Sequence, residues 1–225
     1  MKKMILWAAA LLTQAVFAAD LTANLTFAAD YRTGKTDAVV AKGNPAAKFT
    51  GQPEFTPQGV VIGKGKTSLR YNSAGNLNPA AGAIEICFDS GDLNWHDAKK
   101  LILMQCIGKD LTFYIYKHST DGLGAYFGNR NPKWTAFPRA VPKRLGGKKL
   151  YHLVINYSGD AVECYVDGKL MRSMKVASAP AVFGKYFFVG PAGKRFGGDA
   201  VCTIAKVAAY DRPLSGAEIA ELAKK

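Results

Sequence analysis

One segment of the chain limits its possible folds more than any other: residues 151–175, YHLVINYSGDAVECYVDGKLMRSMK. Apolar and other side chains alternate over residues 153–157, which is the period of a β-strand with one buried face. A second β-rich run, residues 162–166, leads into Asp167-Gly168, and both residues of this pair readily adopt the positive φ angles of a two-residue hairpin turn. A third run covers residues 170–176. The segment predicts an antiparallel meander, whose apolar face needs a second layer to cover it.

The same pattern recurs along most of the chain. Short β-rich or alternating runs lie at residues 59–62, 68–71, 83–88, 101–107, 110–117 and 124–127, with turn-forming residues between them. One strand every ~10 residues is typical of an all-β sandwich or barrel. A helical pattern occurs only at the end, where Ser215 and Glu218 form a capping box before an apolar run. We predict an all-β fold, a two-sheet antiparallel β-sandwich (jelly roll) with one short C-terminal helix.

Two stretches are predicted to be connections. Residues 30–58 are rich in glycine, proline and polar residues, and we expect a surface excursion with one or two short edge strands. Residues 63–67, GKGKT, lie between two short strands, and we expect a hairpin turn there.

The N-terminus predicts export. A lysine pair precedes an apolar run at residues 4–12, and small residues form a Val16-x-Ala18 cleavage site, as in a secretory signal peptide. The alternative is an N-terminal anchor or a buried helix, although the run is short for a bilayer. We assign residues 1–18 to a signal peptide and residues 19–225 to one domain, with no further transmembrane segment. The domain is expected in the periplasm or outside the cell.

The charge of the chain favours anionic partners. Loss of residues 1–18 changes the count from 30 basic and 17 acidic residues to 28 and 17, a formal charge of +11. A surplus of this size suits acidic glycans, lipid headgroups or nucleic acid. Export makes nucleic acid the least suitable of the three, so we expect a glycan or cell-surface ligand. The sequence sets no oligomeric state.

The cysteines predict disulfides. They lie far apart at Cys87, Cys106, Cys164 and Cys202, each in a run expected to be a strand. Their spacing does not support a zinc site. An even number in an exported chain indicates two disulfides with three possible connectivities, and four buried free thiols are the alternative.

Three stretches resemble the concanavalin A-like lectin/glucanase superfamily, and within it the laminin G-like domain. Residues 83–88 are similar to an early core strand of that domain. Residues 151–154 and 164–169 are similar to its W-H-hydrophobic and L-Y-V-D-G-K hairpin, with Tyr151 in place of Trp. Residues 196–219 are similar to its closing signature, F-x-G followed by V-x-x-Y-x-R-x-L-S-x-x-E-I. The resemblance covers nearly all of residues 19–225 and implies two curved antiparallel sheets with a concave face.

The resemblance also directs a search for catalytic residues. Glycosidases of this superfamily carry two carboxylates in phase on one strand. We interpret Glu85 and Asp89 as out of phase, and Asp167, which follows Glu163, is a turn residue. The three histidines are spread out at His96, His118 and His152, and the last fits a structural strand position. We therefore predict no catalytic residues and no enzyme activity; a divergent polysaccharide hydrolase or lyase is an alternative.

One loop gathers acidic residues. Many relatives bind calcium, and the weak metal candidates here are Asp89, Asp92 and Asp97. Their spacing differs from that of a self-contained calcium loop, so solvated carboxylates are the better interpretation. We predict no metal and no other cofactor, and calcium is not supported. Trp95 in this loop is a candidate ligand contact.

The most unusual segment is residues 129–149, NRNPKWTAFPRAVPKRLGGKK, with seven basic residues, no acidic residue and three prolines. Long loops are usually functional or disordered, and its aromatic residues argue against disorder. Trp134 is suited to stack on a sugar face. The basic residues expected to meet carboxylates or sulfates are Arg130, Lys133, Arg139, Lys143 and Arg144. In the alternative, the aromatic residues pack locally and the charges are solvated.

Three functions remain open. We favour an exported non-catalytic binding module for glycans, with acidic polysaccharides favoured by the net charge. A protein-binding adhesion or structural domain is the first alternative, and the divergent hydrolase or lyase is the second. Aromatic residues on the concave face favour sugar, whereas an exposed apolar rim patch favours protein.

Overall fold

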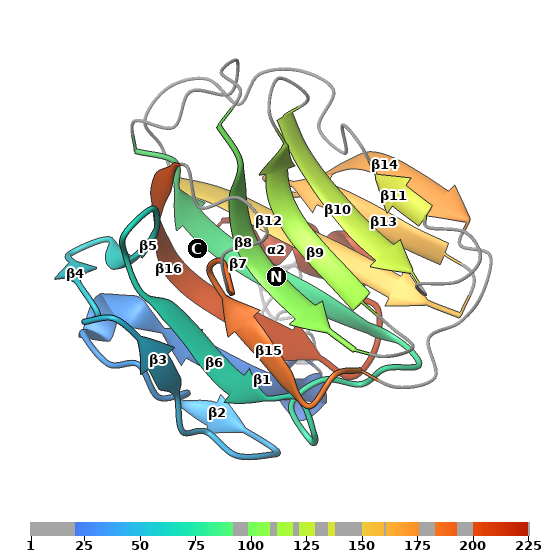
Figure 1. The fold of residues 1–225 in the computed structure, drawn as a ribbon. Helices are drawn as coiled ribbons and strands as arrows, with labels where there is room; N and C mark the ends of the chain where they lie inside the picture. The colour runs from blue at the N-terminus through green and yellow to red at the C-terminus, as the bar shows by residue number, and fades with distance from the viewer. Residues whose placement is uncertain are drawn as a thin grey trace, which may run out of the picture.

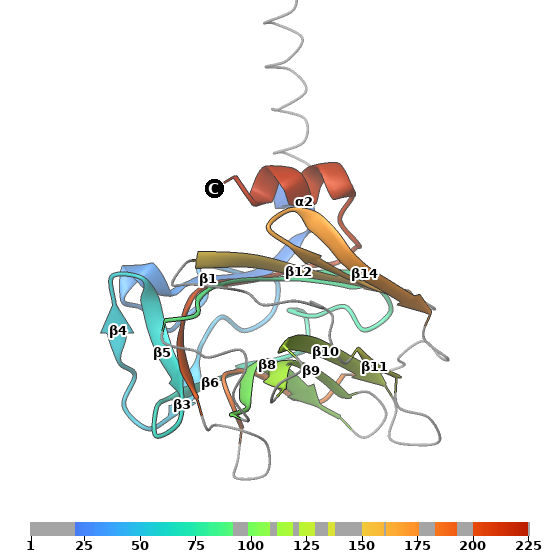
Figure 2. The ribbon, with the colours of Figure 1, turned by 90° about the horizontal axis from the view of Figure 1, so that it is seen from above.

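The structure of the protein is a computed structural model that describes residues 21–91, 99–108, 112–118, 122–128, 135–137, 150–159, 161–175, 183–192 and 200–224. The described strands form two antiparallel sheets, one behind the other in Figure 1. Seen from above in Figure 2, the two sheets are stacked, and helix α2 lies on the outer side of one of them. The predicted two-sheet β-sandwich with a short C-terminal helix is confirmed.

The first sheet has nine strands. Its main path is β14 (Lys169–Lys175), β13 (Ala161–Val166), β12 (Leu150–Ser158), β7 (Gly82–Asp89), β16 (Val201–Tyr210), β1 (Leu25–Asp30) and β2 (Val40–Ala41). Off this path, β5 (Gly59–Gly63) pairs with β16, and β4 (Phe55–Thr56) pairs with β5. Strands from both halves of the chain therefore alternate within one sheet.

The second sheet has seven strands in the order β11 (Thr135–Phe137), β10 (Gly122–Gly128), β9 (Thr112–His118), β8 (Leu101–Ile107), β15 (Tyr186–Val189), β6 (Ser68–Asn72) and β3 (Lys48–Thr50). The predicted excursion at residues 30–58 contains the short helix η1 (Tyr31–Thr33) and the strands β2, β3 and β4. Strand β11 lies within the basic segment at residues 129–149 and pairs with β10.

The core fills the space between the two sheets. Alternate residues of facing strands point inward, and the main cluster joins Ile84 and Ile86 of β7 to Phe113 and Ile115 of β9. An aromatic group closes one side of it. Phe27 packs edge-on against Tyr71 and Phe187 with ring centroids 4.9 and 5.1 Å away, and such contacts stabilise a core beyond simple burial.

The predicted meander is confirmed. Strand β12 pairs with β13, and β13 pairs with β14. The turn residues Asp167 and Gly168 have φ angles of 48° and 78°, as a two-residue hairpin turn requires. The carboxylate of Asp167 also accepts a hydrogen bond of 3.1 Å from the backbone N–H of His152, which ties the turn to the neighbouring strand.

Helix α2 (Gly216–Leu222) begins with the predicted capping box. The Ser215 hydroxyl accepts from the backbone N–H of Glu218, and the Glu218 carboxylate accepts from that of Ser215. Arg212 adds an ion pair to Glu218 at 2.6 Å. The helix buries Ile219 and Leu222 against the outer face of the nine-stranded sheet. Within the described part of the chain, every helix is too short or too polar to cross a bilayer.

Two predictions are wrong. The turn at residues 63–67 is not a hairpin, because β5 pairs in the nine-stranded sheet and β6 in the other, so the turn carries the chain between sheets. The two predicted disulfides are also absent. The four cysteines are free thiols, at Cys87, Cys106, Cys164 and Cys202.

The positions of the cysteines explain why they do not pair. Cys106 is in the seven-stranded sheet, across a core about 10 Å thick from the other three. Cys164 and Cys202 are three strands apart, about 14 Å. Cys87 alternates with the core residues of β7 and faces the other side of the sheet. A disulfide needs Cα atoms within about 7 Å and convergent Cβ vectors.

This arrangement predicts four titratable thiols. Reaction with a thiol reagent in denaturant, without prior reduction, should modify all four cysteines. In the native state the reaction should be slow, because three of the thiols are at most 2% exposed and burial raises the pKa of Cys87 to about 12. Fewer than four modified residues in denaturant, restored to four by a reductant, would reveal a disulfide.

Candidate functional site

The outer face of the seven-stranded sheet carries a group of aromatic side chains. Phe113 and Ile115 of β9 are in the core, so Tyr114 and Tyr116, which alternate with them, point outward and are half-buried. Tyr126 of β10 lies directly opposite Tyr114, with ring centroids 5.7 Å apart. Strands β10, β9, β8 and β15 lie side by side in Figure 1. The three tyrosines therefore form one continuous group, in which Tyr126 is 8% exposed and Tyr114 and Tyr116 are half-buried.

The aromatic surface extends across β8 to β15. Gln105 of β8 lies opposite Tyr114 on one side and Phe188 on the other. Its side chain is fully buried and donates from Nε2 to the carbonyl of Gly190 at 3.4 Å, while Oε1 has no hydrogen-bond partner among the described residues. The floor between the aromatic rings thus holds one polar acceptor. We call this surface, Tyr114, Tyr116, Tyr126, Gln105 and Phe188, the aromatic face.

Positive charge lies at one end of the aromatic face. Arg70 of β6 is opposite Phe188, and its guanidinium lies 4.5 Å from the ring centroid of Tyr186. The ammonium group of Lys185 lies 5.4 Å from the same ring. Stacking of this kind holds a guanidinium flat while its edge remains able to donate hydrogen bonds.

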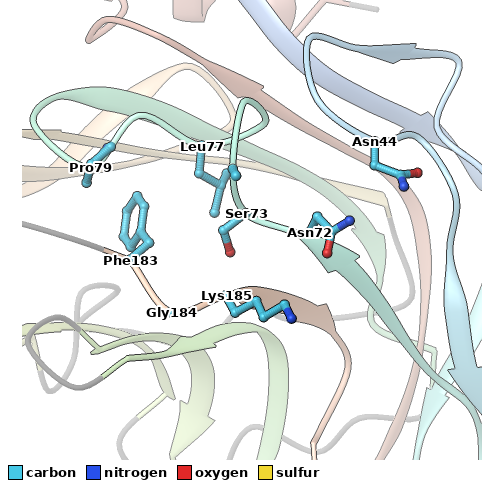
Figure 3. Close-up of a pocket in the computed structure, with 9 residues that line it drawn as sticks. Asn44, Asn72, Ser73, Leu77, Pro79, Phe183, Gly184 and Lys185 are labelled. Atoms are coloured by element: carbon cyan, nitrogen blue, oxygen red, sulfur yellow. The ribbon is translucent and has the colours of Figure 1, made fainter.

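A pocket of about 330 Å³ continues from this charged end. Figure 3 shows Asn72, Ser73 and Lys185 beside the apolar side chains of Leu77 and Phe183. Asn72 connects the pocket to the aromatic face, because it ends β6 and lies opposite Tyr186. An amide, a hydroxyl and an ammonium group beside a ring are the groups that recognise a polar ligand with one apolar face.

The wall of the pocket is held by Asn76. This side chain is fully buried; it donates to the carbonyls of Asn44 and Asn72 at 3.0 and 3.1 Å and accepts from the N–H of Gly43 at 2.9 Å. It therefore fastens residues 43–44 to the turn after β6. Gly43 permits the approach, because a Cβ atom there would lie 2.2 Å from the carbonyl oxygen of Ala74. The pocket is a fixed part of the fold.

A second polar cluster lies on the outer face of the nine-stranded sheet. Glu85 of β7 is 2% exposed and accepts from His152 Nε2 at 3.1 Å, from Tyr210 Oη at 2.9 Å and from Lys206 Nζ at 2.9 Å. Burial would raise the pKa of Glu85, but the hydrogen bonds and charges of His152 and Lys206 lower it to about 2. The Sγ atom of Cys87 lies 4.0 Å from Glu85 Oε1.

No sequence motif indicates this cluster, and the interpretation that Glu85 and Asp89 are out of phase is wrong. Glu85 and Asp89 are four residues apart on β7, opposite Val154 and Leu150 of β12, so strand alternation places them on the same face. They are in phase but about 13 Å apart along the strand, beyond the separation of two glycosidase carboxylates. Glu85, with its low pKa, is also unsuited to act as a general acid.

Most of the site residues predicted from the sequence lie outside the described residues. These are Trp134, Arg130, Lys133, Arg139, Lys143, Arg144, Trp95, Asp92 and Asp97. Asp89 is described, and its carboxylate accepts from the N–H of Gly91 at 2.8 Å, as in a local turn. The period-two pattern of residues 110–117 could have indicated the aromatic face, since it places two tyrosines on one side of a strand.

The two packed antiparallel sheets define a jelly-roll β-sandwich. Within this class the sequence is more specific: residues 88–220, more than half of the chain, match the concanavalin A-like lectin/glucanases superfamily. The chain belongs to this family, as the resemblance in the sequence suggested. No curated protein sequence matches the chain significantly.

Solved structures with the same fold include binding domains of botulinum neurotoxins. A type C domain, described for its interaction with two ganglioside molecules, is similar with a TM-score of 0.74 and 12% identity over 92% of this chain and 52% of that chain. The DC domain in complex with rat synaptotagmin II has a TM-score of 0.71 and 13% identity, over 91% of this chain and 52% of that chain. The DC domain in complex with SialylT has a TM-score of 0.69 and 14% identity, over 89% of this chain and 51% of that chain. The chain thus spans about half the length of these domains, and the likeness concerns the fold.

The low pKa of Glu85 predicts acid sensitivity. A carboxyl whose pKa is lowered on folding stabilises the folded protein at pH values above the ordinary pKa of the carboxyl, which is near 4.5. This stabilisation disappears as the pH falls toward 2. Glu85→Gln should therefore be less stable at pH 7 and should show a smaller loss of unfolding free energy between pH 5 and pH 2, measured by urea denaturation.

The exposed Glu221, paired with Lys224, provides a matched control for this experiment. Glu221→Gln should keep the pH dependence of the wild type. A Glu85→Gln protein with the wild-type dependence would show that Glu85 does not carry this effect.

Proposed function

We propose that the protein is an exported, non-catalytic module that binds glycans on the aromatic face, with acidic glycans preferred. The observation that carries this proposal is the row of tyrosines beside a stacked arginine. Pyranose rings present apolar C–H faces and polar edges, and tyrosine offers the complementary combination of a flat apolar ring and a hydroxyl. Export is inferred from the N-terminal sequence.

The preference for acidic glycans follows from the charges around the face. Arg70 and Lys185 lie at the end of the aromatic face that is next to the pocket. A guanidinium held flat on Tyr186 is oriented for a charge-assisted hydrogen bond to a carboxylate or sulfate. The net charge of +11 after signal removal attracts the same ligands. Trp134 and the basic residues around it remain a proposed second contact.

The solved structures of the same fold support this proposal in part. Two of the neurotoxin binding domains are described with gangliosides or SialylT. These descriptions concern the neurotoxins, and the extension to this chain is our inference. Their low identity transfers no binding residue.

A protein ligand is the second candidate function. Strand β14 is the outermost strand of the nine-stranded sheet, and its residues Leu170 and Met171 are 52% and 37% exposed. Exposed apolar residues on an edge strand are typical of a surface that pairs with another chain. One neurotoxin domain of this fold is in complex with synaptotagmin II. Three basic residues of β14 oppose pairing between copies of this strand.

A glycan array read at low and at physiological salt tests the proposal. Binding should be strongest for uronate, sialylated or sulfated glycans and should weaken with salt, because screening reduces the attraction. Tyr114→Ala and Arg70→Gln should each weaken binding about 3- to 10-fold, the loss of one ring contact or one charged hydrogen bond. Trp134→Ala tests whether the basic segment at residues 129–149 contributes to glycan binding.

Two controls make the result specific. Arg32→Gln removes an equally positive side chain from helix η1, which follows β1 of the other sheet, and should leave binding unchanged; Arg32 pairs with Asp30 there. Leu170→Ala should also leave glycan binding unchanged. The glycan proposal would be rejected in favour of the second candidate if the folded protein bound no glycan and captured a protein ligand, and if Leu170→Ala abolished that capture.

A further inference from the structure

Three unlike metal-ligand groups meet on the outer face of the nine-stranded sheet. Glu85 and Cys87 come from β7, and His152 comes from β12, directly opposite Cys87. One ligand atom of each lies within 4.8 Å of the others. Glu85 Oε1 is 3.1 Å from His152 Nε2 and 4.0 Å from Cys87 Sγ. From this geometry we propose that Glu85, Cys87 and His152 form a binding site for one divalent cation of the zinc type.

The spacing is close to that of ligands around zinc. Bond lengths of about 2.0–2.3 Å to oxygen, nitrogen and sulfur in a tetrahedron place neighbouring ligand atoms about 3.2–3.6 Å apart. The Glu85–His152 distance of 3.1 Å is already close to this value. Cys87 Sγ, 4.0 Å from Glu85 Oε1 and within 4.8 Å of the His152 ligand atom, moves inward when the cation binds. A carboxylate, an imidazole and a thiolate together favour zinc or cobalt over calcium or magnesium. The sequence spacing gave no sign of the site, because two ligands lie on one strand and the third is 65 residues further on.

The surroundings already orient two of the three ligands. Tyr210 holds Glu85 through Oε2, which leaves Oε1 directed at the other two groups. The backbone of His152 is fixed by the Asp167 carboxylate. Such supporting contacts are a regular feature of metal sites.

Lys206 competes with the proposed cation for the Glu85 carboxylate. Its ammonium group contacts both oxygens of Glu85, and its side chain is 28% exposed, so it can leave toward solvent. A second acceptor is close at hand, because Asp30 of β1 lies directly opposite Lys206 on β16. Arg32 is paired with Asp30 and borders the same surface. Binding of the cation therefore moves the ammonium group of Lys206 from the Glu85 carboxylate to the Asp30 carboxylate.

The charges balance in this exchange. The cation adds two positive charges. Cys87 releases its thiol proton to solvent, and Lys206 moves away from Glu85. The proton on His152 Nε2 moves to Nδ1, which has no hydrogen-bond partner among the described residues, so that the neutral imidazole presents Nε2 to the cation. The carboxylate and the new thiolate then neutralise the cation. A bound cation is the usual means of deprotonating a cysteine thiol.

Titration of the untagged protein with Co²⁺ and Zn²⁺ tests the site. Co²⁺ should produce thiolate-to-cobalt charge-transfer absorption, which Zn²⁺ then removes. Cys87→Ser should abolish this absorption, and His152→Gln should weaken Zn²⁺ binding at least tenfold. Lys206→Met should strengthen binding at least tenfold, because it removes the competing cation and leaves all three ligands in place.

The control is Cys164→Ser, which changes a core thiol on a different strand and should keep the cobalt absorption. Near-ultraviolet circular dichroism establishes that each variant is folded. Absence of thiolate-to-cobalt absorption in folded Lys206→Met would overturn the proposal, as would equal Zn²⁺ affinity of the wild type and Cys87→Ser.

Discussion

The pairing of β7 with β12 and β16 is the constraint on which the rest of the structure depends. Eight residues of β7 lie between two long strands that come from later parts of the chain. Their alternation sends Ile84, Ile86 and Phe88 into the core and Glu85 and Cys87 to the outer face. A shift of one residue would bury a carboxylate in the core and expose three large apolar side chains. The hydrogen bonds of Glu85 to His152 and Lys206 fix the same register, since a buried carboxylate without these partners is costly.

This division of faces separates two kinds of chemistry. The interior between the sheets is apolar and aromatic, so polar side chains of these strands lie on the two outer faces. The seven-stranded sheet presents tyrosines with a cationic end and a pocket, which suits a broad, flat ligand. The nine-stranded sheet presents a compact polar cluster beneath its surface, which suits an ion. The two sites lie on opposite sides of the sandwich, as Figure 2 places its two layers, so a ligand on one contacts no residue of the other.

Local signals in the sequence predicted local structure well. The Asp167-Gly168 turn, the capping box at Ser215 and the alternation in most strands each depend on a few neighbouring residues. Properties that depend on the pairing of distant strands were not predictable. Glu85 and Lys206 are 121 residues apart, and nothing in either segment specifies the register that joins them. The disulfide prediction failed for the same reason, because the number of cysteines carries no information on which sheet or face each one occupies.

Binding of a glycan to the aromatic face can be mapped directly through the backbone amide chemical shifts of the protein during titration with a sialylated or uronate-containing oligosaccharide. We expect shifts concentrated in β9, β10 and β15 and around the pocket after β6, with β14 and helix α2 unchanged. Shifts concentrated in β14, or confined to the nine-stranded sheet, would contradict it.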